Sequence, residues 1–480
     1  MEHMKTLNQI YINGEFVTPH GSEIMEFSNP TTGELLVRTR LADEVDARCA
    51  IAAAKAAYPA FSRTTREERM DMLQRLHDAV REGEQELTEV MLAEYGGPLA
   101  SSTAGTVRRA SANFANAKKV LAEYDFVQQH GIARVQMVPL GVVGLITPWN
   151  ANYGFITGKL AMAIASGSTA VIKPSEMSAM QTDALTRLLH KAGLPPGVFN
   201  IVTGRGDTVG AEITRHPDIA KISFTGSTAV GKAIARGAID TLKRVTLELG
   251  GKSPTILLDD ADFAKAMPFA VTAATFNSGQ ACLAGTRLLV PEQRLDEVKR
   301  LVVQEIAKLK VGQPSDPATR IGPMISARQW ERVQGYIRKG VEEGAELLAG
   351  GEGKPQGLEA GNFVKPTVFA NVTNDMTIAR EEIFGPVLSI ISYRTEEEAI
   401  AIANDTSYGL HGYVFSGDLE RANRVASQIV AGRVFINGLY DEPLAPFGGF
   451  RQSGLGREFG KFGLDAYLEP KALMGYENKL

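Results

Sequence analysis

Cys282 lies in a segment suited to nucleophilic chemistry. The sequence FNSGQACLAG places this cysteine between Gly279 and Gly285, with small and polar residues around it. A thiolate is a strong nucleophile, and glycines let a backbone approach a ligand closely. An isolated cysteine is more often a small buried apolar residue, so the hypothesis depends on its neighbours. The only other cysteine, Cys49, lies in an alanine-rich stretch typical of a helix.

Glu248 is a candidate general base. It stands in LELGGKSP, between Leu247 and Leu249 near the end of a β-type run and directly before two glycines. Burial would raise the pKa of this carboxyl group towards the range of a general base at neutral pH. In an alternating strand, an isolated glutamate more often points to solvent, and that alternative stays open.

A glycine turn offers a place for a diphosphate. In FTGSTAVGKAIA a β-type run ends, Gly226 and Gly231 follow, and an alanine-rich helix begins. Backbone N–H groups at a helix N-terminus bind phosphate groups well. The spacing is GxxxxG and not the GxGxxG of ordinary dinucleotide sites, so a tight turn without a ligand is an equal alternative. A second glycine-rich stretch, TGRGDTVG, is interpreted as a supporting loop.

The segment VIKPSE carries two charges at the end of a β-type run. Pro174 forces Lys173 into an extended conformation, and Glu176 follows two residues later. A carboxylate at this edge can accept hydrogen bonds from both hydroxyls of an adenosine ribose, and it would repel a 2′-phosphate. The segment therefore favours NAD over NADP, although a lone Lys/Glu pair is more often a solvated surface pair.

The elements that must position these residues alternate between strand and helix. Apolar runs at 142–146, 169–173, 199–202, 219–225 and 245–249 are mostly followed by helical patterns. This alternation predicts an α/β fold with a doubly wound parallel sheet and a ligand at the carboxyl ends of its strands. A second series predicts a second α/β domain, with Gly250 and Gly251 as the joint. It comprises PTILLDD, TRLLV, VLSIISY, GYVFS and GRVFING, with helices at 292–309 and 418–430.

Two segments fit neither domain. The stretches 120–139 and from 466 onwards are typical of hairpin or edge-strand structure. Because exposed strand edges pair readily with another chain, these segments indicate oligomerisation. A strand that covers its own domain is an equal alternative.

Composition excludes several classes of function. The chain has 480 residues with 44% hydrophobic and 22% charged, and a net charge of -4 without a dense Lys/Arg run. We therefore expect no nucleic-acid and no membrane partner, and no metal. The longest weakly polar run, 160–172, falls short of the roughly 18 residues that a membrane helix needs, and no signal peptide is recognised. Two cysteines form no disulfide framework, which favours the cytoplasm.

Seven motifs in order resemble a known family. They are TPWN (147–150), VIKPSE, FTGSTAVG, LELGGKSP, the GQAC that ends at Cys282, EEIFGPV (381–387) and PFGGFRQSGLGRE (446–458), and they span nearly the whole chain. Together they resemble the NAD(P)-dependent aldehyde dehydrogenase superfamily, in its hydrolytic, non-acylating branch.

The resemblance implies a mechanism. Cys282 would attack the aldehyde, and the oxyanion of the thiohemiacetal would bind the side chain of Asn150 and the backbone N–H of Cys282. Hydride transfer to NAD would leave a thioester, and Glu248 would activate the water that hydrolyses it. Lys159 would assist proton transfer. The residues implied to bind the cofactor are Thr147, Trp149, Lys173, Glu176, Gly206, Gly226, Ser227, Gly231, Leu249, Glu382 and Phe384.

The resemblance also implies an architecture. We expect a Rossmann-like NAD-binding domain over 1–119 and 140–249, and a catalytic domain over 250–465. A small β element over 120–139 and 466–480 would join copies into a homodimer or homotetramer.

Three other functions are weighed against this one. A thiol hydrolase or esterase would pair Cys282 with a histidine base, and no local pattern assigns any of the seven histidines to that role. A CoA-acylating semialdehyde dehydrogenase would release the thioester to CoA, and the presence of Glu248 disfavours it. A silent binding relative should have lost Asn150, Glu248 or Cys282, and all three are present.

The substrate is predicted from side chains around the expected tunnel. Ala151 and Gly158 leave little bulk, which should widen it. No arginine stands at 158 or 277 to bind a carboxylate, and no aromatic box favours a quaternary ammonium group. Asp441 and Glu442, near the expected mouth, disfavour anionic aldehydes. We therefore predict a neutral aldehyde, bulky or aromatic, with Tyr153, Phe155 and Phe276 as candidate walls.

Overall fold

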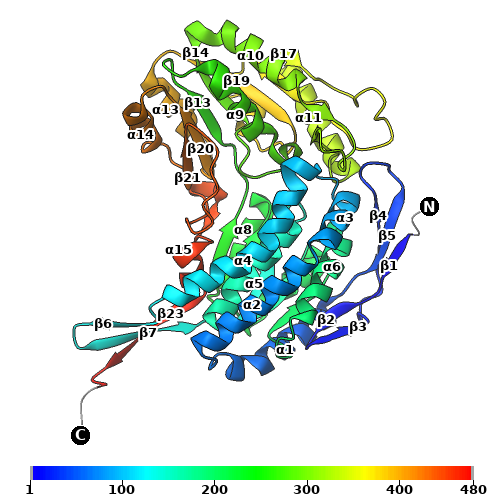
Figure 1. The fold of residues 1–480 in the computed structure, drawn as a ribbon, viewed down its shortest axis with the longest axis vertical. Coiled ribbons are helices and arrows are strands. Elements are labelled where there is room, and N and C mark those ends of the chain that lie inside the picture. Colours follow the sequence, from blue (N-terminus) through cyan, green and yellow to red (C-terminus); the bar gives the residue numbers. More distant parts are fainter. Residues whose placement is uncertain (1–3, 477–480) are drawn as a thin grey trace.

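Two parallel sheets and a projecting arm make up the structure. The computed structural model describes residues 4–476; the predicted domain ends at 1–3 and 477–480 lie outside them. Figure 1 shows the first sheet with its helices in the lower part, the second sheet with its helices above, and the arm at the lower left. The prediction of two α/β units and a small β element is confirmed in fold class.

The first sheet is parallel at its centre. Its five central strands run in the order β12-β11-β8-β9-β10, and antiparallel strands extend both edges, with β22 beside β12 and β2-β3 beside β10. Three predicted strands have the observed bounds, and β12 begins and ends one residue earlier than predicted. The bounds are β2 (Ile10–Ile12), β3 (Glu15–Val17), β8 (Val142–Ile146), β9 (Thr169–Lys173), β10 (Phe199–Ile201), β11 (Ile219–Thr225), β12 (Arg244–Glu248) and β22 (Gly454–Leu455).

Helices cover both faces of this sheet, which is why its strands read as nearly continuous apolar runs. In β8, Val142 and Ile146 pack on one face against α1, α7 and α8, while Val143 and Leu145 pack on the other against the α2–α6 side. The helices are α1 (Glu44–Phe61), α2 (Arg66–Glu82), α3 (Glu84–Glu94), α4 (Ala104–Glu123), α5 (Asn152–Ser166), α6 (Ala179–Lys191), α7 (Ala211–Arg215) and α8 (Thr228–Ile239).

The second sheet has seven strands in the order β17-β18-β19-β14-β13-β20-β21, and only β17 is antiparallel to its neighbour. Helices α9 and α10 cover one part of it, and α11 to α14 cover the rest. The strands are β13 (Pro254–Leu257), β14 (Arg287–Pro291), β17 (Glu346–Ala349), β18 (Thr367–Ala370), β19 (Val387–Tyr393), β20 (His411–Phe415) and β21 (Arg433–Ile436). The helices are α9 (Phe263–Thr275), α10 (Leu295–Ala307), α11 (Ala327–Glu342), α12 (Thr377–Arg380), α13 (Glu396–Asn404) and α14 (Leu419–Ala426).

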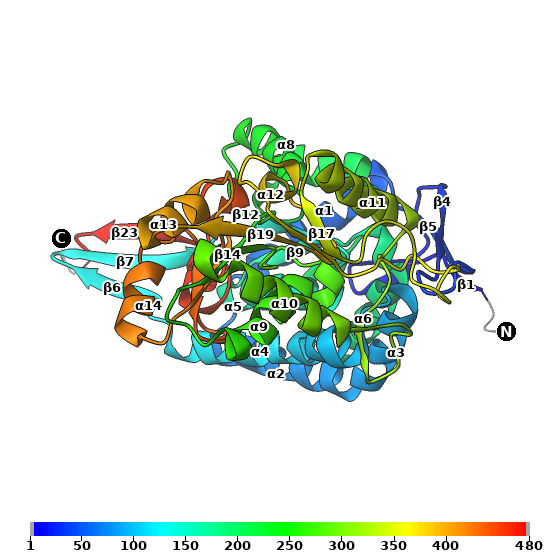
Figure 2. The ribbon, with the colours of Figure 1, turned by 90° about the horizontal axis from the view of Figure 1, so that it is seen from above.

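The arm is a three-stranded antiparallel sheet in the order β23-β7-β6. It brings together β6 (Val127–His130), β7 (Ala133–Pro139) and β23 (Leu468–Met474), as the sequence predicted, whereas residues 120–123 still belong to α4. Figure 2 shows the arm projecting from one end of the molecule. The remaining small elements are a sheet of β1 (Lys5–Leu7), β5 (Leu35–Arg40) and β4 (Ile24–Ser28), the pair β15 (Lys310–Val311) and β16 (Thr319–Ile321), and α15 (Gly460–Asp465).

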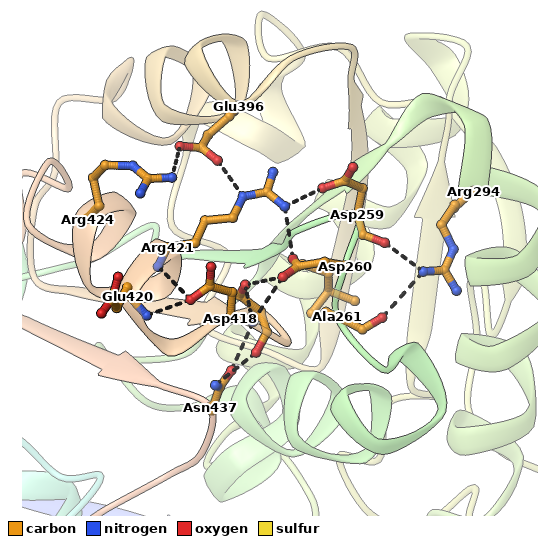
Figure 3. A network of polar contacts seen from close by, with 12 residues as sticks. Asp259, Asp260, Ala261, Arg294, Glu396, Asp418, Glu420, Arg421, Arg424 and Asn437 are labelled. Carbon is orange, nitrogen blue, oxygen red and sulfur yellow. Dashed lines mark hydrogen bonds and ion pairs between the residues drawn. The ribbon is translucent and has the colours of Figure 1, made fainter.

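A polar network fastens one end of the second sheet (Figure 3). The guanidinium group of Arg421 binds Glu396 at the start of α13 and Asp259 and Asp260 after β13. Asp260 also accepts from Ser416, whose backbone exchanges hydrogen bonds with the side chain of Asn437. The network therefore fixes the point at which the chain leaves β21. Among residues 4–476, no helix is long and apolar enough to cross a membrane.

The buried side chain of Arg287 joins β14 to the end of α13. It is fully shielded from solvent, and its donors bind the backbone oxygens of Lys252, Ile402 and Ala403 and the side chain of Asn374. Buried acceptors without donors are costly, so this cation holds together chain segments more than a hundred residues apart.

The substitution Arg287→Met should lower the free energy of unfolding by about 3 kcal/mol or more, because several buried carbonyl oxygens lose their donors. The midpoint of urea-induced unfolding measures this loss. The control is Arg338→Met, which removes an exposed ion pair with Glu352 and should change the free energy by less than about 0.5 kcal/mol. Equal stability of the two variants would contradict the role of Arg287.

Candidate active site

The candidate site is a cavity of about 540 Å³ at the carboxyl ends of the first sheet. The segments after β8, β11 and β12 form one side of it, and segments of the second α/β unit form the other. This is the edge at which parallel α/β sheets bind ligands. The lining residues are Pro148, Trp149, Asn150, Phe155, Met177, Thr225, Gly226, Ser227, Glu248, Leu249, Gly250, Cys282, Ile325, Ser326, Arg328, Gln329, Arg332, Glu382 and Phe384.

The loop before Cys282 has an unusual backbone. Asn277, Ser278 and Gly279 have φ angles of 54°, 58° and 74°, a left-handed region that non-glycine residues adopt only when surroundings enforce it. A Cβ atom on Gly279 would lie 2.2 Å from the backbone of Gly385. A Cβ atom on Gly285 would lie 2.4 Å from Thr255 Oγ1. The expectation that these glycines admit a ligand is corrected, since both admit neighbouring parts of the chain.

Side-chain amides connect this loop to Asn150. The Nδ2 atom of Asn277 donates to the backbone oxygen of Asn150 at 3.1 Å, and Asn150 Nδ2 donates to the backbone oxygen of Gln280 at 2.9 Å. Gln280 is itself held by Pro323 and Ile325. Asn150 therefore lines the same cavity as Cys282, with its amide beside the segment that carries the thiol.

The thiol of Cys282 is held in its neutral form. Cys282 lines the cavity and is partly exposed, but burial by the surrounding protein raises its pKa to about 12, and the carboxyl groups of Glu382 and Glu248 add to the rise. A thiolate at this place requires a compensating positive charge or a base.

Glu248 is buried, so the alternative of a solvent-exposed strand residue is excluded. Only 2% of its surface is exposed, and neither carboxyl oxygen has a hydrogen-bond partner within residues 4–476. Burial raises the pKa of Glu248 well above its usual range, the nearby Glu458 raises it further, and Lys159, Arg457 and Arg433 oppose the rise. A carboxyl group with a raised pKa is a stronger base in its ionised form than an exposed one, which suits general-base catalysis.

Lys159 is also buried, and it binds two residues that sequence reasoning did not single out. Its Nζ atom donates to Ser223 Oγ at 2.9 Å and forms an ion pair with Glu458. Ser223 donates to the same carboxylate at 3.0 Å. Glu458 is the last residue of the motif PFGGFRQSGLGRE, so its acidic character inside that motif was the available signal.

The other end of the cavity has the groups that a dinucleotide needs. Gly226 and Ser227 precede α8, and Ser227 caps the helix through Val230 N at 3.4 Å. Thr225, on the cavity wall, and the buried Thr147 have hydroxyl groups without partners within residues 4–476. The rings of Trp149 and Phe384 meet at 5.5 Å, and Glu382 accepts from Gly251 N at 3.0 Å.

Five predicted cofactor residues lie outside the lining of the cavity: the buried Thr147, Lys173, Glu176, Gly206 and Gly231. Lys173 and Glu176 form an ion pair at 2.9 Å beside Met177, which does line it. A Cβ atom on Gly231 would lie 2.5 Å from the side chain of Leu249, so this glycine allows α8 to pack on Leu249. Gly206 begins a short helical turn over 206–210, where a Cβ atom would meet nothing.

The segment 325–332 was missed entirely by sequence reasoning. Arg332 donates to the backbone oxygen of Glu382 at 2.7 Å, and Gln329 donates to that of Phe384 at 2.8 Å. These contacts hold the EEIFGPV segment against the cavity. Polar residues on a helix are common on any surface, so no local pattern marked these residues as part of a site.

Of the three residues proposed as walls of the substrate tunnel, only Phe155 lines the cavity. Tyr153 is instead a core residue whose hydroxyl donates to the backbone oxygen of Leu87. Phe276 is 40% exposed and is absent from the lining. The expected widening at Gly158 is corrected, because Phe459 and the Nδ2 atom of Asn113 lie 3.6 and 3.3 Å from where its Cβ atom would be.

No histidine is found among the described residues that line the cavity, so the thiol hydrolase alternative lacks its base there. Residues 4–476 also contain no group of His, Cys, Asp or Glu side chains arranged to hold a metal ion.

Comparisons with known proteins agree with this geometry. The model of the aldehyde dehydrogenase family matches residues 16–473. A 3-succinoylsemialdehyde-pyridine dehydrogenase from a Pseudomonas species is 45% identical over 99% of this chain and 100% of its own length. Aldehyde dehydrogenase C from Pseudomonas syringae, solved with NAD+ and octanal, is 45% identical with a TM-score of 0.96, over 98% and 97% of the two chains.

A Mycobacterium tuberculosis aldehyde dehydrogenase in complex with NAD+ is 39% identical with a TM-score of 0.95, over 98% and 99% of the two chains. The match to the family model and the similarity of the relatives extend along nearly the full chain. They confirm the resemblance inferred from the seven motifs. The chain therefore belongs to the aldehyde dehydrogenase family and is an oxidoreductase that acts on aldehydes.

Proposed function

We propose that this enzyme oxidises a neutral, bulky aldehyde to a carboxylic acid with NAD, through a thioester on Cys282. The observation that carries the proposal is a single cavity lined by a thiol, a buried carboxyl group and a side-chain amide, Cys282, Glu248 and Asn150.

The covalent steps follow from these three groups. The sulfur of Cys282 adds to the aldehyde carbon, the carbonyl oxygen becomes an oxyanion, and the thiol proton is released to the solvent that reaches the partly exposed Cys282. The amide of Asn150 and the backbone N–H of Cys282 stabilise that oxyanion. When bound, NAD+ would supply the hydride acceptor, since its positively charged nicotinamide ring becomes neutral when it takes the hydride of the aldehyde carbon. The carbon–sulfur bond is then that of a thioester.

Glu248 completes the reaction as a general base. It takes a proton from the water that attacks the thioester carbon, the carbon–sulfur bond breaks, and the thiol of Cys282 is restored as the acid leaves. The buried Lys159, with its ion pair to Glu458, acts electrostatically on Glu248 and assists the movement of that proton.

The end of the cavity lined by Trp149, Gly226 and Ser227 supports the proposal that the cofactor is NAD. The unpartnered hydroxyl of Thr225 and the α8 N-terminus at Ser227 suit a diphosphate, while Trp149 and Phe384 suit the nicotinamide end. Leu249 and Glu382 line the same region. Glu176, next to Lys173, would bind the adenosine ribose and repel a 2′-phosphate.

Two relatives support the neutral substrate. One is named for a pyridine semialdehyde, and the other was solved with octanal. Neither substrate name denotes a carboxylate, and in this chain Phe155 supplies an aromatic wall to the cavity that Asn150 also lines. The exposed Asp441, paired with Arg109 at 2.7 Å, keeps an acidic group in the loop after β21.

We also propose a homodimer or homotetramer in the cytoplasm. The arm carries exposed apolar side chains, including Val127 and Ile132, and further ones follow on and after α8, Ile239 and Leu242. Exposed apolar groups and a strand edge favour association with a second copy. Both cysteines are free, as in reducing compartments.

In Glu248→Gln, one NADH per active site should form in a fast first phase, followed by steady turnover at least a hundredfold slower than in the wild type, because only thioester hydrolysis needs the base. In the wild type, the hydrolysis rate should rise with pH through the raised pKa of Glu248 and then level off. Stopped-flow absorbance of NADH measures both phases.

The control Cys282→Ala should form no NADH at all. Wild-type steady turnover in Glu248→Gln would contradict the role of the carboxylate, and turnover that requires added CoA would support the acylating alternative.

Glu176→Gln should raise kcat/KM for NADP and lower it for NAD, each on the order of tenfold, because it removes the charge that repels a 2′-phosphate. Steady-state kinetics with both cofactors measure the ratio. The exposed Glu26→Gln, which removes an ion pair with Arg38, should leave the ratio unchanged. An unchanged ratio in Glu176→Gln would place the ribose contact elsewhere.

The kcat/KM for octanal or a pyridine carbaldehyde should exceed that for succinate semialdehyde by at least tenfold. Phe155→Ala should lower the value for the bulky aldehydes by roughly tenfold through lost apolar contact, with the amount of NADH in the first phase preserved. A preference for succinate semialdehyde would refute the neutral substrate.

A further inference from the structure

Gly448 lies against the carboxyl group of Glu248. It belongs to the segment PFGGF and has a φ of +148°, a conformation that L-residues rarely adopt. A Cβ atom on Gly448 would lie 2.7 Å from Glu248 Oε1 and 2.9 Å from both Arg457 Cδ and the backbone oxygen of Gly456. Any side chain here must displace the carboxyl group of Glu248 or the backbone opposite it.

The same loop also holds the backbone of Glu248. Within this loop, residues 447–458, which we call the glycine cradle, β22 pairs Gly454 with Glu248 and Leu455 with Leu247. Leu249 N donates to the oxygen of Ser453 at 2.9 Å, and Ser453 Oγ donates to the oxygen of Gly250 at 2.6 Å.

The cradle is closed at its base. Phe447 and Glu458 exchange backbone hydrogen bonds of 2.8 and 2.7 Å, so both ends of the loop meet. Glu458 in turn binds Lys159 and Ser223. The loop is therefore anchored to the first sheet, and its position relative to Glu248 is fixed.

Packing against the backbone at Gly448, and not a hydrogen-bond partner among the described residues, sets the position of the Glu248 carboxyl group. Neither of its oxygens accepts a hydrogen bond from the described residues. The charged groups that act on it, Glu458, Lys159, Arg457 and Arg433, do so without a direct hydrogen bond. A base held by hydrogen-bond donors would lose basicity, whereas a base held by backbone packing keeps both oxygens free for water.

We propose that Gly448 is a positioning residue that keeps the carboxyl group of Glu248 where it activates the hydrolytic water, and so directs the acyl-enzyme to water. The inference rests on the proposed role of Glu248 as the base. It assigns to the glycine cradle the selection between hydrolysis and transfer of the acyl group to another nucleophile.

The variant Gly448→Ala tests the inference in single-turnover and steady-state kinetics. We expect a first phase of one NADH per site, as in the wild type, and steady turnover at least tenfold slower. Hydroxylamine, which attacks thioesters without a general base, should restore steady NADH formation and yield the hydroxamate. The control is Gly335→Ala, at a helical position where a Cβ atom meets nothing, and it should match the wild type in every measurement.

A double variant separates positioning from a general loss of structure. If the added methyl group displaces the carboxyl group, then Glu248→Asp should slow hydrolysis less in the Gly448→Ala background than in the wild type. Independent effects that multiply would overturn the inference, as would loss of the first phase in Gly448→Ala or slow turnover that hydroxylamine does not restore.

Two single variants keep the test decisive if Gly448→Ala does not fold. In Glu248→Asp, the side chain is one methylene shorter, which moves the carboxyl group away from Gly448. This variant must show a full first phase of NADH, slow hydrolysis and restoration of turnover by hydroxylamine. Hydrolysis within threefold of the wild type would overturn the inference. If Glu248→Gln itself hydrolyses the thioester normally, the proposed base is wrong. If Gly448→Ala hydrolyses the thioester normally while Glu248→Gln does not, the proposed role of the glycine cradle is wrong and Glu248 remains the base.

Discussion

The close approach of two backbones at Gly250 and Gly251 determines the geometry of the site. A Cβ atom on Gly251 would lie 2.3 Å from the carbonyl oxygen of Cys282, and one on Gly250 would lie 2.6 Å from Glu382 Oε2. Because glycine has no side chain at either position, the segment after β12 can pass between the loop that carries Cys282 and the EEIFGPV segment. Glu248, two residues earlier in the chain, then shares one cavity with Cys282. Larger residues at this joint would separate the two α/β units and the groups they carry.

That proximity has an electrostatic consequence. Burial raises the pKa of both the Cys282 thiol and the Glu248 carboxyl group, and the carboxyl groups of Glu382 and Glu248 raise that of Cys282 further by disfavouring a second negative charge. Both the thiol of Cys282 and the carboxyl group of Glu248 therefore resist ionisation. Under the proposed mechanism, the positive charge of the oxidised nicotinamide would stabilise a thiolate, so cofactor binding would favour ionisation of Cys282.

Local sequence patterns predicted the bounds of the strands well, but they predicted the long-range contacts of single residues poorly. The runs that became β8, β9 and β11 are buried on both faces along almost their whole length, and burial on both faces leaves little choice of bounds. The burial of Glu248 could not be read locally, since the same alternation also fits an exposed residue. Gly279 was expected to face a ligand and instead packs on Gly385, more than a hundred residues away. Glu458, Gln329 and Arg332 were missed because long-range pairing decides their roles.

The substrate side shows how a local loss of volume is compensated from a distance. Gly158 removes a side chain from α5, and in a sequence that loss suggests open space. In the folded chain, Asn113 from α4 and Phe459 from beyond the glycine cradle occupy it, and Phe459 also packs against Phe447 at 5.6 Å. Interiors pack densely, so a missing side chain on one element is commonly filled by another. Phe459 directly follows the glycine cradle, so the anchoring of the cradle beside Glu248 also places the ring that fills the space left by Gly158 on α5.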